Sequence, residues 1–357
     1  MFFWESLDSD RMKRVIAAVA TVACVVSLPV PALADGPALR AVSLLFLWPR
    51  AELFDVTADG AGGVWVGGVQ GRYCVRWADF CVLYGDGNPV VRRRVGSAWK
   101  EYPINDWTGQ GAIGQIVTGA GGTWIAGGPS TRGGPSTYVA RFDGSAFQKV
   151  AIPDGAIGML STGPAGTFIS HWDLDPGQRL LKRTGDGWTA VTVPGIDNVE
   201  DLQGLSASDA WAVGFRQDLR TGSLPAVAHF DGAAWKSVPL PPGTGTEWFL
   251  KVVPVASDNV WAITQKHLAH WNGSAWTLIA APAGIADLAD LTVDASGTPW
   301  VAPAEAADPS QTPCRYRDGS WETVALPAGA EVHDLAAVPG GVWGVGRHGD
   351  GPAAFTG

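Results

Sequence analysis

The sequence predicts an all-β fold, a seven-bladed β-propeller of four-stranded antiparallel blades whose ring is closed by the N-terminal strand. One aromatic position recurs seven times in short apolar segments such as Val-Trp-Val-Gly-Gly, and a second recurs six times after a glycine-containing turn. A unit of strands and turns with a period of about 40 to 50 residues is typical of propellers and solenoids. The first position holds Trp65, Trp124, Phe168, Trp211, Trp261, Trp300 and Trp343, and the second holds Trp99, Phe147, Trp188, Trp235, Trp276 and Trp321.

Each unit has the pattern of four strands. The first runs into a turn such as residues 57–63, and the second carries the first aromatic. The third ends in an Asp-Gly or Asn-Gly hairpin, for which we expect a type I′ turn with positive φ at both central residues. The fourth carries the second aromatic and usually stops at a proline, which cannot donate to a sheet ladder. The hairpins lie at residues 142–144, 230–232, 271–273 and 317–319.

These sheets are apolar on both faces, so each needs cover on both sides. Radial stacking supplies it, because small residues fit near the axis while bulky rings fill the wider gap between blades. The repeated tryptophans, out of 18 in the chain, are therefore expected to pack between blades.

The ring closure follows from the two ends of the chain. The last unit stops at residues 353–357, where its siblings continue into a fourth strand. Residues 35–44 resemble that missing continuation, with Leu39 at the place of the second aromatic. We therefore expect this N-terminal strand to complete the seventh blade and leave no free edge between blades.

Residues 1–34 resemble an export signal. Lys13 and Arg14 precede an apolar run, and Ala32-Leu33-Ala34 is a small-residue cleavage pattern. We expect a secreted protein whose single propeller domain spans 35–357, with translation possible from Met12. The alternative is a lipid anchor at Cys24, although its lipobox lacks the leading leucine.

Composition excludes some partners. The formal net charge of −9 argues against nucleic acid or an anionic membrane surface. The abundance of alanine, glycine and arginine resembles that of proteins from GC-rich bacteria. No nucleophile elbow, phosphate-binding loop or metal-ligand spacing is present. His229 and His270 hold the same place in two third strands, which favours packing over catalysis. No cofactor and no membrane span are expected, and a monomer is predicted.

Three cysteines follow the cleavage pattern. Cys74 and Cys81 lie within the longest insertion, residues 69–89, and in an exported protein they are expected to bridge each other. Cys314 is left over and is expected to be buried in a third strand.

Segments such as Ser-Ala-Ser-Asp-Ala-Trp-Ala-Val-Gly (206–214) and the 58–68 stretch resemble the repeats of secreted bacterial β-propellers. These include two-component-regulator propellers, Asp-box repeats of sialidase-like proteins and WD40-like repeats. The resemblance spans the mature chain and implies the architecture only, because the arginine cluster and tyrosine nucleophile of sialidases cannot be located here.

Five aromatic residues break the repeat pattern in loops expected on one face of the ring. Rigid rings in such loops supply contact area for a sugar or a peptide, whereas local packing under long loops is the simpler explanation. These candidate ligand-binding residues are Trp77, Tyr84, Trp107, Trp172 and Trp248.

A second candidate is a ring of residues nine or ten places before each first aromatic. Four of these seven are acidic, and together they could hold Ca²⁺ or a cationic group at the mouth of the central channel; the alternative is four aspartates that bond to nearby amides. The candidate metal ligands are Asp55, Asp201, Asp290 and Asp334, and the other three members are Gln115, Met159 and Lys251.

The sequence thus predicts a secreted propeller that acts as a binding module for carbohydrate, peptide or an extracellular protein. The alternative is an extracellular lyase or hydrolase with its site at the channel mouth. Perturbed titratable groups around a deep axial pocket would favour the enzyme, and a shallow aromatic face would favour the binder.

Overall fold

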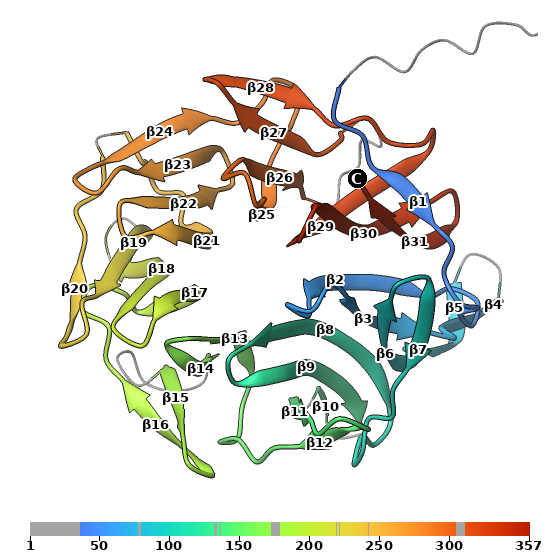
Figure 1. Cartoon of the computed structure of the whole chain (residues 1–357). Helices are drawn as coiled ribbons and strands as arrows, with labels where there is room; N and C mark the ends of the chain where they lie inside the picture. The colour runs from blue at the N-terminus through green and yellow to red at the C-terminus, as the bar shows by residue number, and fades with distance from the viewer. Residues whose placement is uncertain are drawn as a thin grey trace, which may run out of the picture. The chain divides into compact units, whose positions relative to one another are not determined.

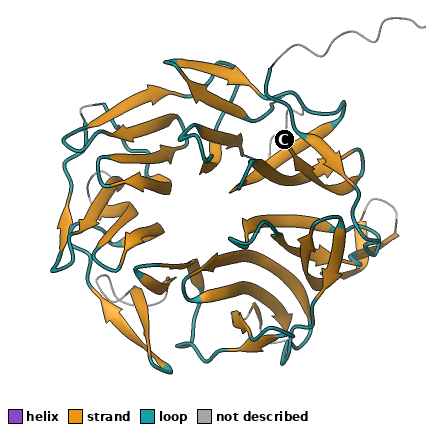
Figure 2. Cartoon of the chain, viewed as in Figure 1, coloured by secondary structure: helices purple, strands orange, loops and turns teal. Residues whose placement is uncertain are grey.

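The computed structural model describes residues 36–77, 80–131, 134–135, 137–172, 179–218, 220, 222–241, 243–304 and 311–357. Gly36–Gly357 forms one compact unit, and its described residues form strands and loops without a helix (Figure 2). Accordingly, no described helix is long and apolar enough to cross a membrane. The expected signal peptide, with Met12 and Cys24, lies outside the described residues.

The described strands form a ring of seven four-stranded antiparallel blades, a β-propeller (Figure 1). In six blades the strands follow chain order from the centre outward. These are β2 (Glu52–Ala58), β3 (Val64–Gln70), β6 (Asn88–Val95), β7 (Ala98–Glu101); β8 (Gln110–Gly119), β9 (Gly122–Thr131), β11 (Tyr138–Phe142), β12 (Phe147–Lys149); β13 (Ile157–Gly163), β14 (Gly166–His171), β15 (Leu180–Thr184), β16 (Gly187–Val191); β17 (Asn198–Ser206), β18 (Asp209–Asp218), β19 (Gly222–Phe230), β20 (Trp235–Ser237); β21 (Phe249–Ala256), β22 (Asn259–Thr264), β23 (His267–Trp271), β24 (Trp276–Ala280); and β25 (Leu288–Val293), β26 (Pro299–Pro303), β27 (Cys314–Arg317), β28 (Ser320–Thr323). We number these blades one to six.

Blade seven confirms the predicted closure. It contains β29 (Ala330–Val338), β30 (Gly341–His348), β31 (Gly351–Thr356) and, as its outer strand, β1 (Arg40–Val42) from the other end of the chain. Antiparallel pairing places Arg40 opposite Thr356, and Figure 1 shows the blue β1 beside the dark red β31. Leu39 is buried in the same apolar cluster as Trp300 of blade six, the place predicted for a second aromatic.

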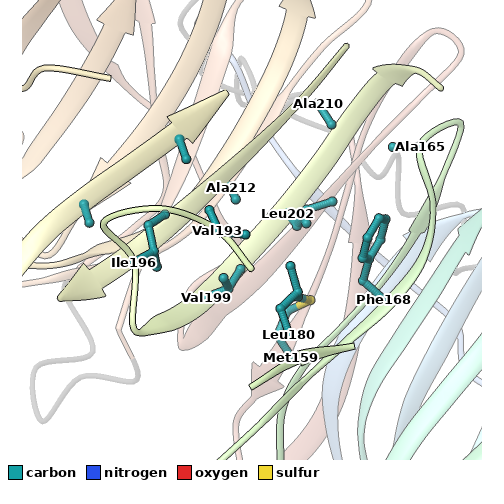
Figure 3. Packing of buried hydrophobic residues seen from close by; sticks show 12 residues of the cluster. Met159, Ala165, Phe168, Leu180, Val193, Ile196, Val199, Leu202, Ala210 and Ala212 are labelled. Carbon is teal, nitrogen blue, oxygen red and sulfur yellow. The ribbon is translucent and has the colours of Figure 1, made fainter. Parts of the chain in front are cut away.

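Packing between blades explains the repeated aromatics. Among the described residues, seven clusters of buried apolar side chains form, one at each junction of neighbouring blades. In several, the first aromatic of one blade meets the second aromatic of the next, as Trp65 meets Phe147 with ring centroids 5.5 Å apart and Trp211 meets Trp276 at 5.8 Å. Figure 3 shows the junction of blades three and four, where Phe168 lies across from Leu202.

The hairpin prediction was right in place and mostly wrong in turn type. Only at residues 317–319, among the four predicted hairpins, do both central residues have positive φ, 50° at Asp318 and 80° at Gly319. In the other three only the glycine does. There the aspartate or asparagine folds the loop with its side chain instead: Asp143 Oδ1 accepts the N–H groups of Ser145 and Ala146, at 2.8 and 2.9 Å.

The longest insertion forms a hairpin of its own. Strands β4 (Tyr73–Trp77) and β5 (Phe80–Gly85) make a separate two-stranded sheet beside blade one, and the short β10 (Gly134–Pro135) extends β9 in blade two. Both insertions join a second strand to a third.

Candidate functional site

Three adjoining pockets form a groove on the loop face, which we define as the side of the ring where β2, β8 and β13 begin. The largest, about 1070 Å³, lies between the start of β8, the end of β9 and the segment 149–157. The second, about 610 Å³, lies between the β4–β5 hairpin, Arg50 and the end of β30. The third, about 220 Å³, lies at the start of β2 and β29. Shared lining residues join them: Phe54, Ala112, Gly128, Glu52 and Arg347.

The floor of the groove is made by glycine and alanine in the largest pocket. Gly127 has no room for a side chain, because a Cβ there would lie 2.4 Å from the Ala112 carbonyl oxygen and 3.0 Å from the Trp107 ring. The lining of this pocket contains one aromatic ring, that of Phe54. The largest pocket is therefore not an aromatic platform.

Charged groups gather at the blade-one end of the groove. The Arg72 guanidinium pairs with the Glu52 carboxylate at 2.5 Å and lies 5.6 Å from the centroid of the Phe54 ring. Arg347, in contrast, makes no ion pair or side-chain hydrogen bond with any residue that the structure describes. This end of the groove therefore holds one neutralised pair and the unpaired Arg347 guanidinium. Other charged residues also line the groove: Arg50, Asp86 and Asp350 in the second pocket, and Lys149 and Asp154 in the largest.

Three of the five predicted aromatics lie close to this groove. Trp107 supports it from below, since it packs on Tyr138 with centroids 4.9 Å apart and its Nε1 donates to the Gly109 carbonyl. Trp172 lies beside the end of the groove formed by segment 149–157, and its side chain is 43 % exposed. Its backbone N–H donates to the Ala156 carbonyl. Tyr84 is 68 % exposed on the hairpin whose residues 73, 74 and 85 line the second pocket.

The other two predicted aromatics do not join them. Trp248 packs on Phe215 of blade four, with centroids 4.9 Å apart, and lines none of these pockets. Trp77 ends β4, but its side chain lies outside the part of the chain that the structure describes. A binding role for these five side chains stays a prediction.

The predicted acidic ring occupies one structural position in all seven blades. Each member directly follows an extra residue, a β-bulge, in the innermost strand. At five of these positions the side chain accepts a hydrogen bond from a backbone N–H of the next blade's innermost strand. The bonds are Asp55 to Ile116 (2.7 Å), Gln115 to Leu160 (2.7 Å), Asp201 to Val252 (2.9 Å), Asp290 to Leu335 (2.7 Å) and Asp334 to Val56 (2.7 Å).

Lys251, a sixth member of the ring, supplies the positive charge for these carboxylates. Its Nζ lies 3.3 Å from Asp290 Oδ1. Burial opposes its charged form, but the surrounding aspartates, Asp290 foremost, raise the pKa of Lys251 above its ordinary value. The described residues contain no group of three or more His, Cys, Asp or Glu side chains arranged for a metal ion. The Ca²⁺ site stays a prediction, and a built-in ammonium already lies beside these carboxylates.

Burial raises the pKa values of three aspartates in this ring. It raises the pKa of Asp55 to about 6, partly offset by Lys251 and by the Ile116 N–H. The pKa values of Asp201 and Asp334 are raised by burial too. Perturbed acids therefore exist at the centre of the ring, but each also carries an inter-blade hydrogen bond, and none lines the three pockets of the groove.

The repeated histidines have a packing role. His270 stacks on Trp261 at 4.1 Å between centroids, and His229 lies on Trp211 at 4.5 Å, each directly across the ladder from its tryptophan. In four other blades the same cross-strand place holds an arginine or lysine over the first aromatic ring: Arg93, Arg141, Lys182 and Arg315.

Two of the three cysteines that follow the cleavage pattern can be compared with the prediction of one disulfide and one free thiol. Cys74 is disulfide-bonded, and Cys314 is a free, buried thiol in β27. The Cys81 side chain lies outside the described residues, so its pairing with Cys74 stays a prediction. A bridge within this hairpin would stiffen one wall of the groove.

The fold places the chain among β-propeller proteins. No family model matches the chain, and no curated protein sequence matches it. A catalytically inactive variant of virginiamycin B lyase from Staphylococcus aureus, solved with quinupristin, has 13 % identity and a TM-score of 0.59, with 89 % of this chain and 98 % of that one covered. YCF48 bound to the D1 peptide has 13 % identity and a TM-score of 0.55, with 89 % and 97 % covered.

An extracellular domain is similar as well. It comes from a B. thetaiotaomicron protein described as a hybrid two-component system, with 10 % identity, a TM-score of 0.59, and 89 % of this chain but 39 % of that one covered. At such identities the similarity concerns the fold alone. Structural neighbours of this chain thus include an enzyme, a peptide-bound protein and the extracellular domain of a hybrid two-component system, all built as β-propellers.

Proposed function

We propose that this protein is a secreted binding module that holds an extended peptide in the loop-face groove. The observation that carries the proposal is the continuity of the three pockets from segment 149–157 to Arg347 across blades one and two. A trough of this length suits a linear ligand better than a compact one.

A peptide suits the lining better than a carbohydrate does. Sugar sites use exposed flat rings, whereas the largest pocket has the single ring of Phe54 among small, aliphatic and polar residues. Small residues let a ligand approach the main chain closely, and main-chain hydrogen bonds are the usual source of affinity for an extended peptide. Peptide binding in the YCF48 structure is an analogy of fold only.

The test is a peptide array and a glycan array probed with the exported protein, with and without Ca²⁺. We expect retention on peptides, independent of Ca²⁺, that decreases at least tenfold in Gly114→Val, because Gly114 lines the largest pocket and a side chain there meets open space. A matched variant, Gly163→Val at the other end of β13, also meets open space away from the groove and controls for the added side chain. Binding to glycans alone, or unchanged binding by Gly114→Val that folds normally, would refute the proposal.

A second candidate function is hydrolysis or elimination at the centre of the ring. The specific observation is the raised pKa of Asp55 beside Asp334, since acids with pKa values near neutrality can transfer protons at neutral pH. Activity that appears with a substrate panel and disappears in Asp55→Asn, while peptide binding persists, would support this function. Peptide binding without turnover of any substrate would contradict the enzyme and support the binding module.

A further inference from the structure

Three of the residues that line the smallest pocket are β-bulge residues, and the residue type at this position differs from blade to blade. Bulges in β25, β29 and β2 leave Ala289, His333 and Phe54 outside the ladder register, and all three line this pocket. Its volume of about 220 Å³ is below the range of roughly 300 to 1,000 Å³ that encloses a whole small ligand. The pocket therefore has room for one end of a ligand, not for a chain that passes through.

The charge in this pocket is that of a single arginine. The Glu52 carboxylate is neutralised by Arg72 at 2.5 Å. His333 Nε2 lies 2.9 Å from the Leu53 carbonyl oxygen. Because a carbonyl oxygen can only accept, Nε2 donates its proton there and cannot bind a ligand. The half-buried Arg347 guanidinium has no ion-pair or hydrogen-bond partner among the described residues.

An unpaired guanidinium beside an apolar wall selects for a particular group. Arginine presents a planar pair of donors that matches a carboxylate in a bidentate fashion. The apolar part of the lining is formed by Phe54, Leu53 and Ala289. A ligand end with a carboxylate next to an apolar side chain would satisfy both sides.

We propose that this pocket binds the C-terminal carboxylate of the peptide ligand, with Arg347 as the carboxylate-binding residue and Phe54 as the contact for an apolar last side chain. The proposal rests on the proposed function, since it assigns the ligand's end within the same groove. The preceding residues of the peptide then extend from Phe54 into the largest pocket, which shares this residue.

The experiment uses three matched pools of fluorescein-labelled random hexapeptides on the exported protein. One pool has free C-terminal carboxylates, one has C-terminal amides, and one has amides with an internal Asp or Glu. We expect the free-carboxylate pool to be retained at least tenfold more than the plain amides. Arg347→Gln should abolish this preference, and Arg347→Lys should restore part of it.

The matched control is Arg317→Gln, which changes an exposed arginine at the end of β27 and should keep the preference. Equal retention of the free-carboxylate peptides and the plain amides overturns this inference but not the proposed peptide-binding function. Equal retention of the acidic amides overturns the assignment of the C-terminus. Failure to retain any pool overturns both the inference and the proposed function, and a normal melting temperature for Arg347→Gln shows that its loss of preference is not unfolding.

Discussion

Acidification from pH 7.5 to pH 4.5 should strengthen the part of the folding stability that depends on Asp55. Its pKa is raised from 3.8 to about 6 in the folded protein, first of all by burial. An acid whose pKa is raised by folding stabilises the folded state most when it is protonated. The contribution of Asp55 to the free energy of unfolding is therefore fully present below pH 3.8 and is lost as the pH rises through 6. At about 1.4 kcal/mol per pKa unit the shift corresponds to about 3 kcal/mol, and solvent access near Lys251 reduces this to about 1 to 2 kcal/mol.

The assay is urea unfolding of the wild type and of Asp55→Asn at pH 4.5, 6.0 and 7.5. The asparagine keeps an oxygen that can accept the Ile116 N–H but cannot ionise. The wild type should therefore lose about 1 to 2 kcal/mol of unfolding free energy relative to the variant as the pH rises. Taking the difference between the two proteins removes the opposite effect of His270, whose pKa is lowered by burial, so its stability contribution is lost on acidification.

Asp186→Asn serves as the control, because Asp186 has a fully exposed side chain and should leave the pH profile unchanged. The residues that act on Asp55 electrostatically, Lys251, Asp334 and Asp290, remain in place in both proteins. A difference between wild type and Asp55→Asn that stays constant across these pH values would refute the reasoning.

Three further outcomes are expected. A chain that starts at Ser43 lacks β1 and should melt well below the exported protein in calorimetry, because β31 becomes a free edge; equal melting would contradict the closure. Trp211→Ala should cost about 3 to 5 kcal/mol in urea unfolding, through the cavity left between two blades, whereas the exposed Trp172→Ala should cost under about 1 kcal/mol; equal losses would place Trp172 in the core. Mass spectrometry of the exported protein should find Cys74 linked to Cys81, and any other partner for Cys74 would contradict the hairpin assignment.

Repetition made the architecture predictable from one sequence. Seven copies of one pattern act as an internal alignment, so the blade number, the strand order and even Leu39 as the substitute for an aromatic could be inferred. The same alignment identified the ring that includes Asp55 and Lys251. It did not reveal the hydrogen bonds from these side chains to the next blade, because such bonds depend on the bulge geometry of two strands that are far apart in sequence.

The groove could not be predicted in the same way, because its lining is drawn from segments that do not repeat. Arg347 and Phe54 are ordinary residues in sequence, and nothing near them suggests that they share a pocket. Trp107 and Trp172 were visible as exceptions to the repeat, and the structure places them under and beside the groove. Trp248 was an equally visible exception and lies elsewhere, since an unusual ring can also pack locally.

The seven blades together distinguish scaffold from site. The position directly after each bulge is constrained: five of its seven described members bond to the neighbouring blade, and a sixth, Lys251, is the counter-ion of the four aspartates among them. The bulge residue itself varies in kind, from Gly114 to Phe54. Because bulge residues are released from the ladder, they can face a pocket without weakening the sheet. A propeller can therefore change its ligand at these positions while it keeps its ring, and the pocket beside Arg347 is formed where three such residues meet.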